Sequence, residues 1–337
     1  MLRNWFEGWT EPGSAKQSVL MIGGGVLAAL LLICVVLGWY WSREPDTFWV
    51  EETPPNEMRV VGYSTVNTLI RTVEWLLEKP GGYLSNDVTP PSVLLDNMPN
   101  FEFGVLVQCR DLARVLRNDY SRSQSQSLED ADLALAEPAL NFSNDSWIFP
   151  TTESKYREAL SHLRSFQARM VDSNPADARF FARADNLREW LVVVERRLGG
   201  LSQRLSASVG QRRVNVDLAG EPSAAGTSPL GEDVLVRTPW LQIDDVFYEA
   251  RGTAWALLHF MRAAQFDFEG VLEDKNAVVS LRQIIRELEG SLEPVASPII
   301  LNGDGFGMFA NHSLVLASYL SRAHSAVIDL RSLLAQG

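Results

Sequence analysis

The side chains best suited to acid–base or metal-ligand chemistry near neutral pH are the four histidines. They are His162, His259, His312 and His324. The last two stand twelve residues apart in one predicted helix, and at roughly 100° per residue they lie about 120° apart around its axis. They cannot form a compact ligand pair without another helix, so we expect a structural role for each histidine.

Sequence motifs that define common enzyme classes are missing from the chain. There is no Gly-x4-Gly-Lys phosphate loop, no Gly-x-Ser-x-Gly turn, no His-Glu-x-x-His helix and no Cys-x-x-Cys pair. Asn302-Gly-Asp-Gly faintly resembles a calcium loop, but Phe306 and Met308 stand where oxygen ligands are needed. We therefore predict no catalytic residues, no cofactor and no metal, and an enzyme is the less favoured interpretation.

Four arginines form the polar group that could best contact a ligand or a partner. They are Arg110, Arg114, Arg117 and Arg122. They could line a groove for an acidic ligand, or they could be solvated charges that pair with neighbouring carboxylates. The chain has a formal net charge of −12, which argues against nucleic acid as a partner because phosphate binding needs clustered positive charge.

One segment has the composition of a membrane span. Residues 17–42 contain no charged side chain, and about twenty apolar residues suffice for a helix to cross the hydrocarbon layer. A cleaved signal peptide would be shorter and would end in small residues, whereas this segment ends in Trp39-Tyr40-Trp41. We predict an uncleaved transmembrane helix over residues 18–42.

The charges that flank this helix favour a cytoplasmic N-terminus. Arg3 and Lys16 precede the helix and only Arg43 follows it closely, and basic residues are enriched on the cytoplasmic side. We therefore expect residues 1–17 to be cytoplasmic and, in a bacterial cell, residues 59–337 to form a periplasmic domain.

Aromatic and small residues suggest how the membrane segment contacts its surroundings. Aromatic rings favour the headgroup region, and the candidate interfacial anchors are Trp39, Tyr40, Trp41, Phe48 and Trp49. Small residues four apart let two membrane helices approach closely and could support a homodimer. These are Gly24 with Ala28, and Gly25 with Ala29. Glycine is also simply common in membrane helices, so both interpretations stay open.

Beyond the membrane segment the chain is predicted to be helical. A proline- and acid-rich tether over residues 43–58 comes first. Apolar residues then recur at spacings of three and four, most regularly from Leu187 to Leu205, where Gly199-Gly200 could form a kink. Residues 211–237 lack periodicity and are predicted to be a flexible connection. The predicted fold is all-α, a single N-terminal transmembrane helix followed by a mostly antiparallel helical bundle.

Three stretches carry a resemblance to a known family. They are Gly81-Gly-Tyr-Leu-Ser-Asn-Asp87, Asp96-Asn-Met-Pro-Asn100 with Glu102-Phe-Gly104, and Ser121-Arg-Ser-Gln-Ser-Gln-Ser127. In these the chain resembles an uncharacterised family of proteobacterial inner-membrane proteins, a domain of unknown function. The resemblance covers the anchor and most of the remaining chain. It implies a Gram-negative source and an inner-membrane location, and it implies no activity and no catalytic residues.

An anchor, a bundle and no catalytic motif favour a non-enzymatic function. The leading hypothesis is a membrane-anchored periplasmic scaffold or adaptor of the cell envelope that binds a protein partner. The alternatives are an envelope enzyme of unrecognised type acting on lipid or peptidoglycan, and a ligand-sensing subunit that signals through a partner. The bilayer is the expected partner of the membrane helix in each case.

Overall fold

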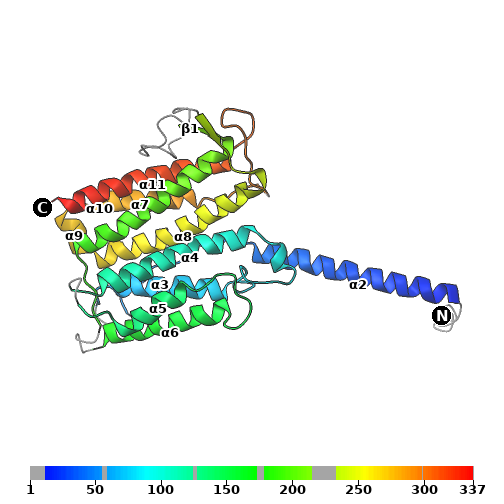
Figure 1. The fold of residues 1–337 in the computed structure, drawn as a ribbon, viewed down its shortest axis with the longest axis horizontal. Coiled ribbons are helices and arrows are strands. Elements are labelled where there is room, and N and C mark those ends of the chain that lie inside the picture. The colour runs from blue at the N-terminus through cyan, green and yellow to red at the C-terminus, as the bar shows by residue number, and fades with distance from the viewer. Residues whose placement is uncertain are drawn as a thin grey trace, which may run out of the picture.

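The computed structural model describes residues 12–54, 59–123, 127–172, 178–214, 233–297 and 299–336, and most of this part is helical (Figure 1). The α-helices are α2 (Pro12–Trp41), α3 (Tyr63–Glu78), α4 (Asn97–Val115), α5 (Ala131–Leu140), α6 (Thr152–Val171), α7 (Ala184–Ser206), α8 (Ile243–Asp267), α9 (Glu269–Asp274), α10 (Val278–Ser291) and α11 (His312–Ala335). Short turns are η1 (Ser92–Leu94), the π-helical η2 (Leu116–Tyr120), η3 (Ala207–Val209) and η5 (Trp240–Gln242). The all-α prediction is confirmed.

Two short strands lie at the borders of the predicted flexible connection. Strand β1 (Gln211–Val214) pairs antiparallel with β2 (Asp233–Val236), so that Gln211 is opposite Val236. The residues between them, 215–232, lie outside the described part, as do residues 1–11 of the predicted cytoplasmic segment and residues 55–58 of the predicted tether.

Helix α2 leaves one end of the bundle and projects away from it (Figure 1). Its segment Gln17–Trp41 is the one described helix that is long and apolar enough to cross a membrane, with a mean hydropathy of 2.9 and none of its most apolar window buried. A Cβ atom added at Gly24 or Gly25 would have no neighbour within 4 Å. The packing of a second helix there therefore stays a prediction.

The bundle has α4 and α8 at its centre, with α7, α10 and α11 on one side and α3, α5 and α6 on the other (Figure 1). The two central helices touch through their backbones. A Cβ atom at Gly252 of α8 would lie 2.0 Å from the carbonyl oxygen of Phe101, and one at Gly104 of α4 would lie 2.1 Å from that of Glu249. Glycine is therefore required at both positions, because any side chain would occupy the space of the facing backbone.

The regular apolar seam predicted from Leu187 to Leu205 is buried against α11. Helix α7 continues without interruption through Gly199-Gly200. Gly199 makes room for a neighbouring helix, since a Cβ atom there would lie 3.1 Å from Nε2 of His324 on α11.

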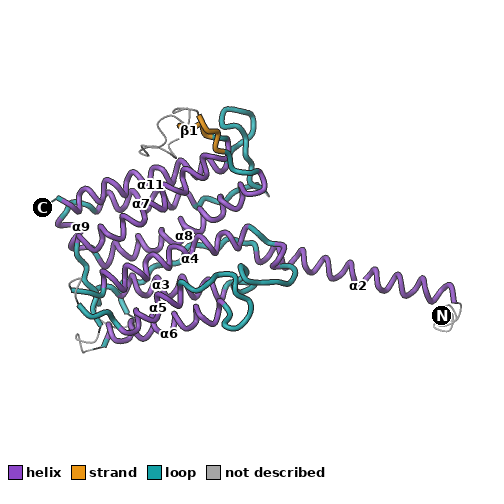
Figure 2. Tube along the Cα trace, viewed as in Figure 1, coloured by secondary structure: helices purple, strands orange, loops and turns teal. Residues whose placement is uncertain are grey.

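The helices run back and forth, so their connecting loops gather at two ends of the bundle (Figure 2). We call the end from which α2 departs the α2 end; it carries the α3–α4, α5–α6, α7–α8 and α10–α11 loops. The opposite end carries the α4–α5 and α6–α7 loops, the segment from α8 to α10, and the C-terminus.

Candidate functional site

The segment after α2 lies against the bundle, and we call residues 43–54 the strap. It runs along α8, away from the α2 end. Its three polar contacts with α8 are Glu44 to Arg251, the Asp46 carbonyl to Trp255, and the Phe48 amide to His259. Two extended residues span about 6.6 Å and four helical residues about 6 Å. The strap and α8 therefore stay in register over about two helical turns, from Arg251 to His259.

His259 joins the strap to α8 through both of its ring nitrogens. Nδ1 lies 2.6 Å from the carbonyl oxygen of Trp255, and Nε2 accepts a hydrogen bond of 3.0 Å from the Phe48 amide. The Phe48 ring stacks on the imidazole with ring centroids 3.9 Å apart. Burial lowers the pKa of His259 to about 4, so the ring is neutral at pH 7, as an acceptor Nε2 requires. This histidine has a structural role.

Arg251 binds the segment that directly follows α2. Its Nε and Nη2 atoms donate to the Glu44 carboxylate at 2.8 and 2.5 Å. The remaining bonds go to the carbonyl oxygens of Ser291, Leu292 and Glu293 at the C-terminal end of α10. A guanidinium has five N–H donors, and these bonds occupy them. The side chain is 5% exposed, so Arg251 connects α10 to the start of the strap and has no donor left for a ligand.

A second buried ion pair supports the end of α2. Lys79 and Glu102 lie 2.6 Å apart and their side chains are 2% and 0% exposed. The carboxylate also accepts from the amides of Leu84 and Ser85 and from the Ser85 hydroxyl. Burial raises the pKa of Glu102, while the Lys79 ammonium and these hydrogen bonds oppose the rise. The pair thereby holds the turn that follows α3.

That turn receives the last residue of α2. Gly81 has φ +88°, and a Cβ atom there would lie 2.8 Å from the indole of Trp41. Positive φ favours glycine in any case, and here a side chain would also displace the Trp41 ring. The end of α2 is thus seated on the bundle through this turn, through Arg251 and through His259.

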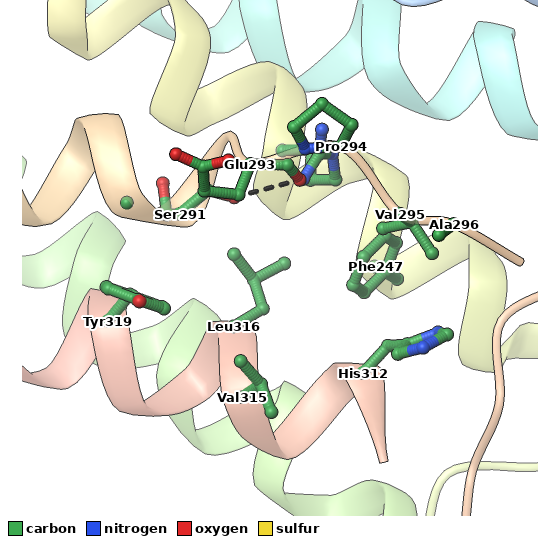
Figure 3. Close-up of a pocket in the computed structure, with 12 residues that line it drawn as sticks. Phe247, Ser291, Glu293, Pro294, Val295, Ala296, His312, Val315, Leu316 and Tyr319 are labelled. Carbon is green, nitrogen blue, oxygen red and sulfur yellow. Dashed lines mark hydrogen bonds between the residues drawn. The ribbon is translucent and has the colours of Figure 1, made fainter. Parts of the chain in front are cut away.

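The bundle has a small hollow at the α2 end, between α8, α10 and α11. Its volume is about 240 Å³. Phe247, Val315 and Leu316 supply apolar walls, and His312 and Tyr319 supply polar groups. Figure 3 shows Leu316 and Tyr319 rising from α11 below the end of α10, with His312 at the start of the same helix.

His312 and Tyr319, which line this hollow, both contact other parts of the bundle. Nδ1 of His312 accepts from the Leu301 amide at 3.1 Å, and burial lowers its pKa. The Tyr319 ring occupies the space of a side chain at Gly290, since a Cβ atom added there would lie 2.4 Å from the ring. The arrangement suits a small apolar group and offers no activated nucleophile.

A cluster between α5 and α6 brings a histidine, a serine and an aspartate together. His162 Nδ1 lies 3.0 Å from Asp132, while Ser165 Oγ and Arg169 each donate to the same carboxylate at 2.7 Å. In a nucleophilic triad the serine bonds to the histidine. Here it bonds to the aspartate, so the cluster is a polar contact between two helices. No group of three or more metal-binding side chains occurs in the described residues.

The four arginines singled out in the sequence do not surround a common groove. Arg110 donates to the carbonyl oxygens of Leu140 and Phe142 at the end of α5. Arg117 bonds to Glu129 and Glu137, and Arg122 also approaches Glu129. Arg114 is exposed on α4. The guanidinium groups of Arg110 and Arg117 thus donate to acceptors within the bundle.

The predicted interfacial anchors fall into two groups. Trp39 and Tyr40 are 63% and 47% exposed at the end of α2, where a headgroup layer would lie. Trp41 packs on the bundle. Phe48 and Trp49 lie beside His259, sixteen residues into α8 and so about 24 Å along the helix from the α2 end. That distance corrects their assignment as headgroup anchors. The prediction of a tether over residues 43–58 is also corrected, because residues 43–54 are hydrogen-bonded to the bundle.

The sequence contained part of this information. Arg251 and His259 stand among apolar residues in the sequence, and a charged or polar residue among buried neighbours needs a partner. No local pattern, however, connects them to Glu44 and Phe48, which lie more than 200 residues away in the chain.

The chain was compared with known protein families, curated proteins and solved structures. A family model described as "Uncharacterized protein conserved in bacteria (DUF2333)" matches residues 14–337. No curated protein and no solved structure gives a significant match.

Proposed function

The chain belongs to the bacterial family DUF2333, and from that premise we propose that it is a scaffold or adaptor anchored in the inner membrane by α2. The helical body stands in the periplasm and binds a protein partner. The observation that carries the proposal is the rigid joint between α2 and the bundle, which gives the body one orientation relative to the membrane. A scaffold needs such a fixed orientation, because it presents its surface to a partner in the same envelope.

The polar groups in the interior support this proposal through their contacts. Arg251, Glu102 and His259 each hold one chain segment against another. Asp267 does the same, since its carboxylate accepts from the amides of Gly62 and Thr65 at the start of α3. These buried groups stabilise the bundle and leave its recognition surface to side chains on the outside.

The strap offers a surface of this kind. Trp49 is 81% exposed and stands at a hollow of about 570 Å³ between the strap and the last turns of α8. Arg71 fixes the backbone beneath it, donating to the Trp49 carbonyl oxygen at 2.8 Å. An exposed tryptophan beside a hollow is typical of residues that dominate protein interfaces. We place the partner's contact here.

Site-specific photo-crosslinking in the native membrane tests the proposal. A photoreactive phenylalanine analogue at Trp49 is expected to give a discrete adduct of higher mass, whereas the same probe at the exposed Val279 in the first turn of α10 is expected to give none. Recovery of the unmodified chain from both positions would refute the adaptor function. Reporter fusions at the two termini test the topology, with the expected signals cytoplasmic for the N-terminus and periplasmic for the C-terminus.

One observation favours a second function, a ligand-sensing subunit. The small hollow at the α2 end is lined by Arg251, the residue that holds the root of α2. A small apolar ligand in the hollow would change the surroundings of this joint. Such a ligand is expected to raise the melting temperature of the wild-type protein and to have no effect after Leu316→Trp, which fills the hollow. Equal shifts in both proteins would exclude this site.

A further inference from the structure

The α2 end of the bundle exposes large apolar side chains in each of its four loops. Leu94 in the α3–α4 loop is 74% exposed, Phe149 in the α5–α6 loop 93%, and Trp240 before α8 77%. In the α10–α11 loop, Phe306 is fully exposed and Met308 is 99% exposed. Soluble surfaces scatter such residues singly, whereas here they share one end of the molecule.

The opposite end has a different surface. Among the described residues, its exposed large apolar side chains are Val61, Leu128 and Val279, and no exposed aromatic ring accompanies them. The two ends are built from the same helices, and the loops of the α2 end include the longer ones, such as residues 79–96 and 292–311 against residues 121–130 and 172–183. The large exposed apolar side chains therefore gather on the loops around the exit of α2.

The α2 end is level with the end of the predicted membrane span. A Cβ atom at Gly38 of α2 would lie 3.5 Å from Leu95 and 3.7 Å from Pro91, so the α3–α4 loop packs against the last turns of α2. Trp41 sits on the turn at Gly81. Trp39 and Tyr40, with Arg43 stacked 4.0 Å from the Trp39 ring, mark the same level as a headgroup layer. Figure 1 shows α2 leaving from this end.

The joint between α2 and the bundle prevents this end from turning away from the membrane. A flexible tether would let the body reorient freely. The contacts of Glu44, Asp46 and Phe48 along α8 instead fix the strap over about two helical turns. The loops that surround the exit of α2 must then face the surface of the bilayer that α2 enters.

We propose that the α2 end is a membrane-docking face, whose apolar loop tips insert into the interfacial layer of the bilayer that α2 spans. This inference rests on the proposed function, since it requires α2 to be membrane-spanning. The loops insert by burying apolar and aromatic surface. Carboxylates such as Asp145, Glu293 and Asp304 lie in the same loops, so attraction to anionic headgroups does not drive the contact.

Nitroxide depth measurements on the full chain in lipid nanodiscs test this proposal. Cys34→Ser removes the cysteine in α2, and Cys109 is fully buried and stays. Labels are placed singly at Leu31→Cys in α2, at Phe149→Cys and Phe306→Cys in two loops of the α2 end, and at Val279→Cys at the opposite end. Collisions with oxygen, which concentrates in lipid, are compared with collisions with a water-soluble nickel chelate.

The expected result is a preference for oxygen at Leu31, Phe149 and Phe306 and for nickel at Val279. It should be the same in purely zwitterionic nanodiscs and in nanodiscs with anionic lipid. Water-like collisions at Phe149 and Phe306 with a lipid-like Leu31 would overturn the docking face and leave the anchor intact. A water-like Leu31 would overturn the anchor as well. Protection of both loops from both reagents would show that protein covers them, and would also overturn the proposal.

Discussion

The close contact between α4 and α8 predicts how much one added methyl group, at Gly252, destabilises the bundle. Replacing Gly252 by alanine adds a Cβ atom 2.0 Å from the Phe101 carbonyl oxygen, whereas ordinary contacts begin near 3.4 Å. The neighbour is a backbone carbonyl in the second turn of α4, so no side-chain rotation can relieve the clash. The two central helices must move apart by more than 1 Å.

The magnitude follows from two opposing effects. Overpacking a core costs about 1–3 kcal/mol, and a clash between two backbones belongs at the upper end of that range. Alanine recovers about 1 kcal/mol through its higher helix propensity. We expect Gly252→Ala to lower the free energy of unfolding by about 2 kcal/mol, which for a body of this size lowers the melting temperature by roughly 4 °C.

Gly200 is the matched control. It also lies inside a helix, but it is exposed and a Cβ atom there would have no neighbour within 4 Å. Gly200→Ala should therefore raise the stability by about 0.5–1 kcal/mol. Both variants and the wild type are compared by urea unfolding in mild detergent, with tryptophan fluorescence as the signal. If the two alanine variants shift in the same direction, the close contact of α4 and α8 is not present in solution.

Three further predictions concern the buried polar contacts. Burial holds the pKa of His259 at about 4, below its ordinary value of 6.5, so the unfolded chain takes up the proton first and the free energy of unfolding falls as the pH drops from 6.5 towards 4. In His259→Leu this acid-dependent fall should be smaller by about 3 kcal/mol, measured as the difference between urea unfolding at pH 7 and near pH 4. Lys79→Met leaves the Glu102 carboxylate buried without its cation and should cost about 3–5 kcal/mol in the same unfolding assay at pH 7, with a smaller loss when Glu102→Leu is added. Glu44→Ala should cost about 1–3 kcal/mol because Arg251 loses its carboxylate partner, and it should accelerate amide hydrogen exchange in residues 43–50, whereas unchanged exchange there would show that Arg251 does not hold the strap.

Periodicity within a helix could be predicted from the sequence, and contacts between distant segments could not. The leucine seam from Leu187 to Leu205 identified α7 because its neighbours in space are also neighbours in sequence at spacings of three and four. The same local pattern could not predict that glycine is required at position 104. The reason is the backbone of Glu249 on α8, which lies against this position only in the folded structure. Gly199 shows the same limit, since the side chain for which it makes room, His324, lies on α11.

The strap shows why composition misled the prediction for residues 43–54. Acidic and proline-rich segments are extended when solvent is their best partner, and residues 43–54 do lack helix and strand. The acids of this segment, however, bond to guanidinium groups of the bundle: Glu51 bonds to Arg71 on the next helix, and Glu44 bonds to Arg251, 207 residues away in the chain. Because the strap backbone is extended, two of its residues span about the same length as four residues of α8. An apparently flexible composition therefore produces the rigid joint on which both the scaffold and the membrane-docking face depend.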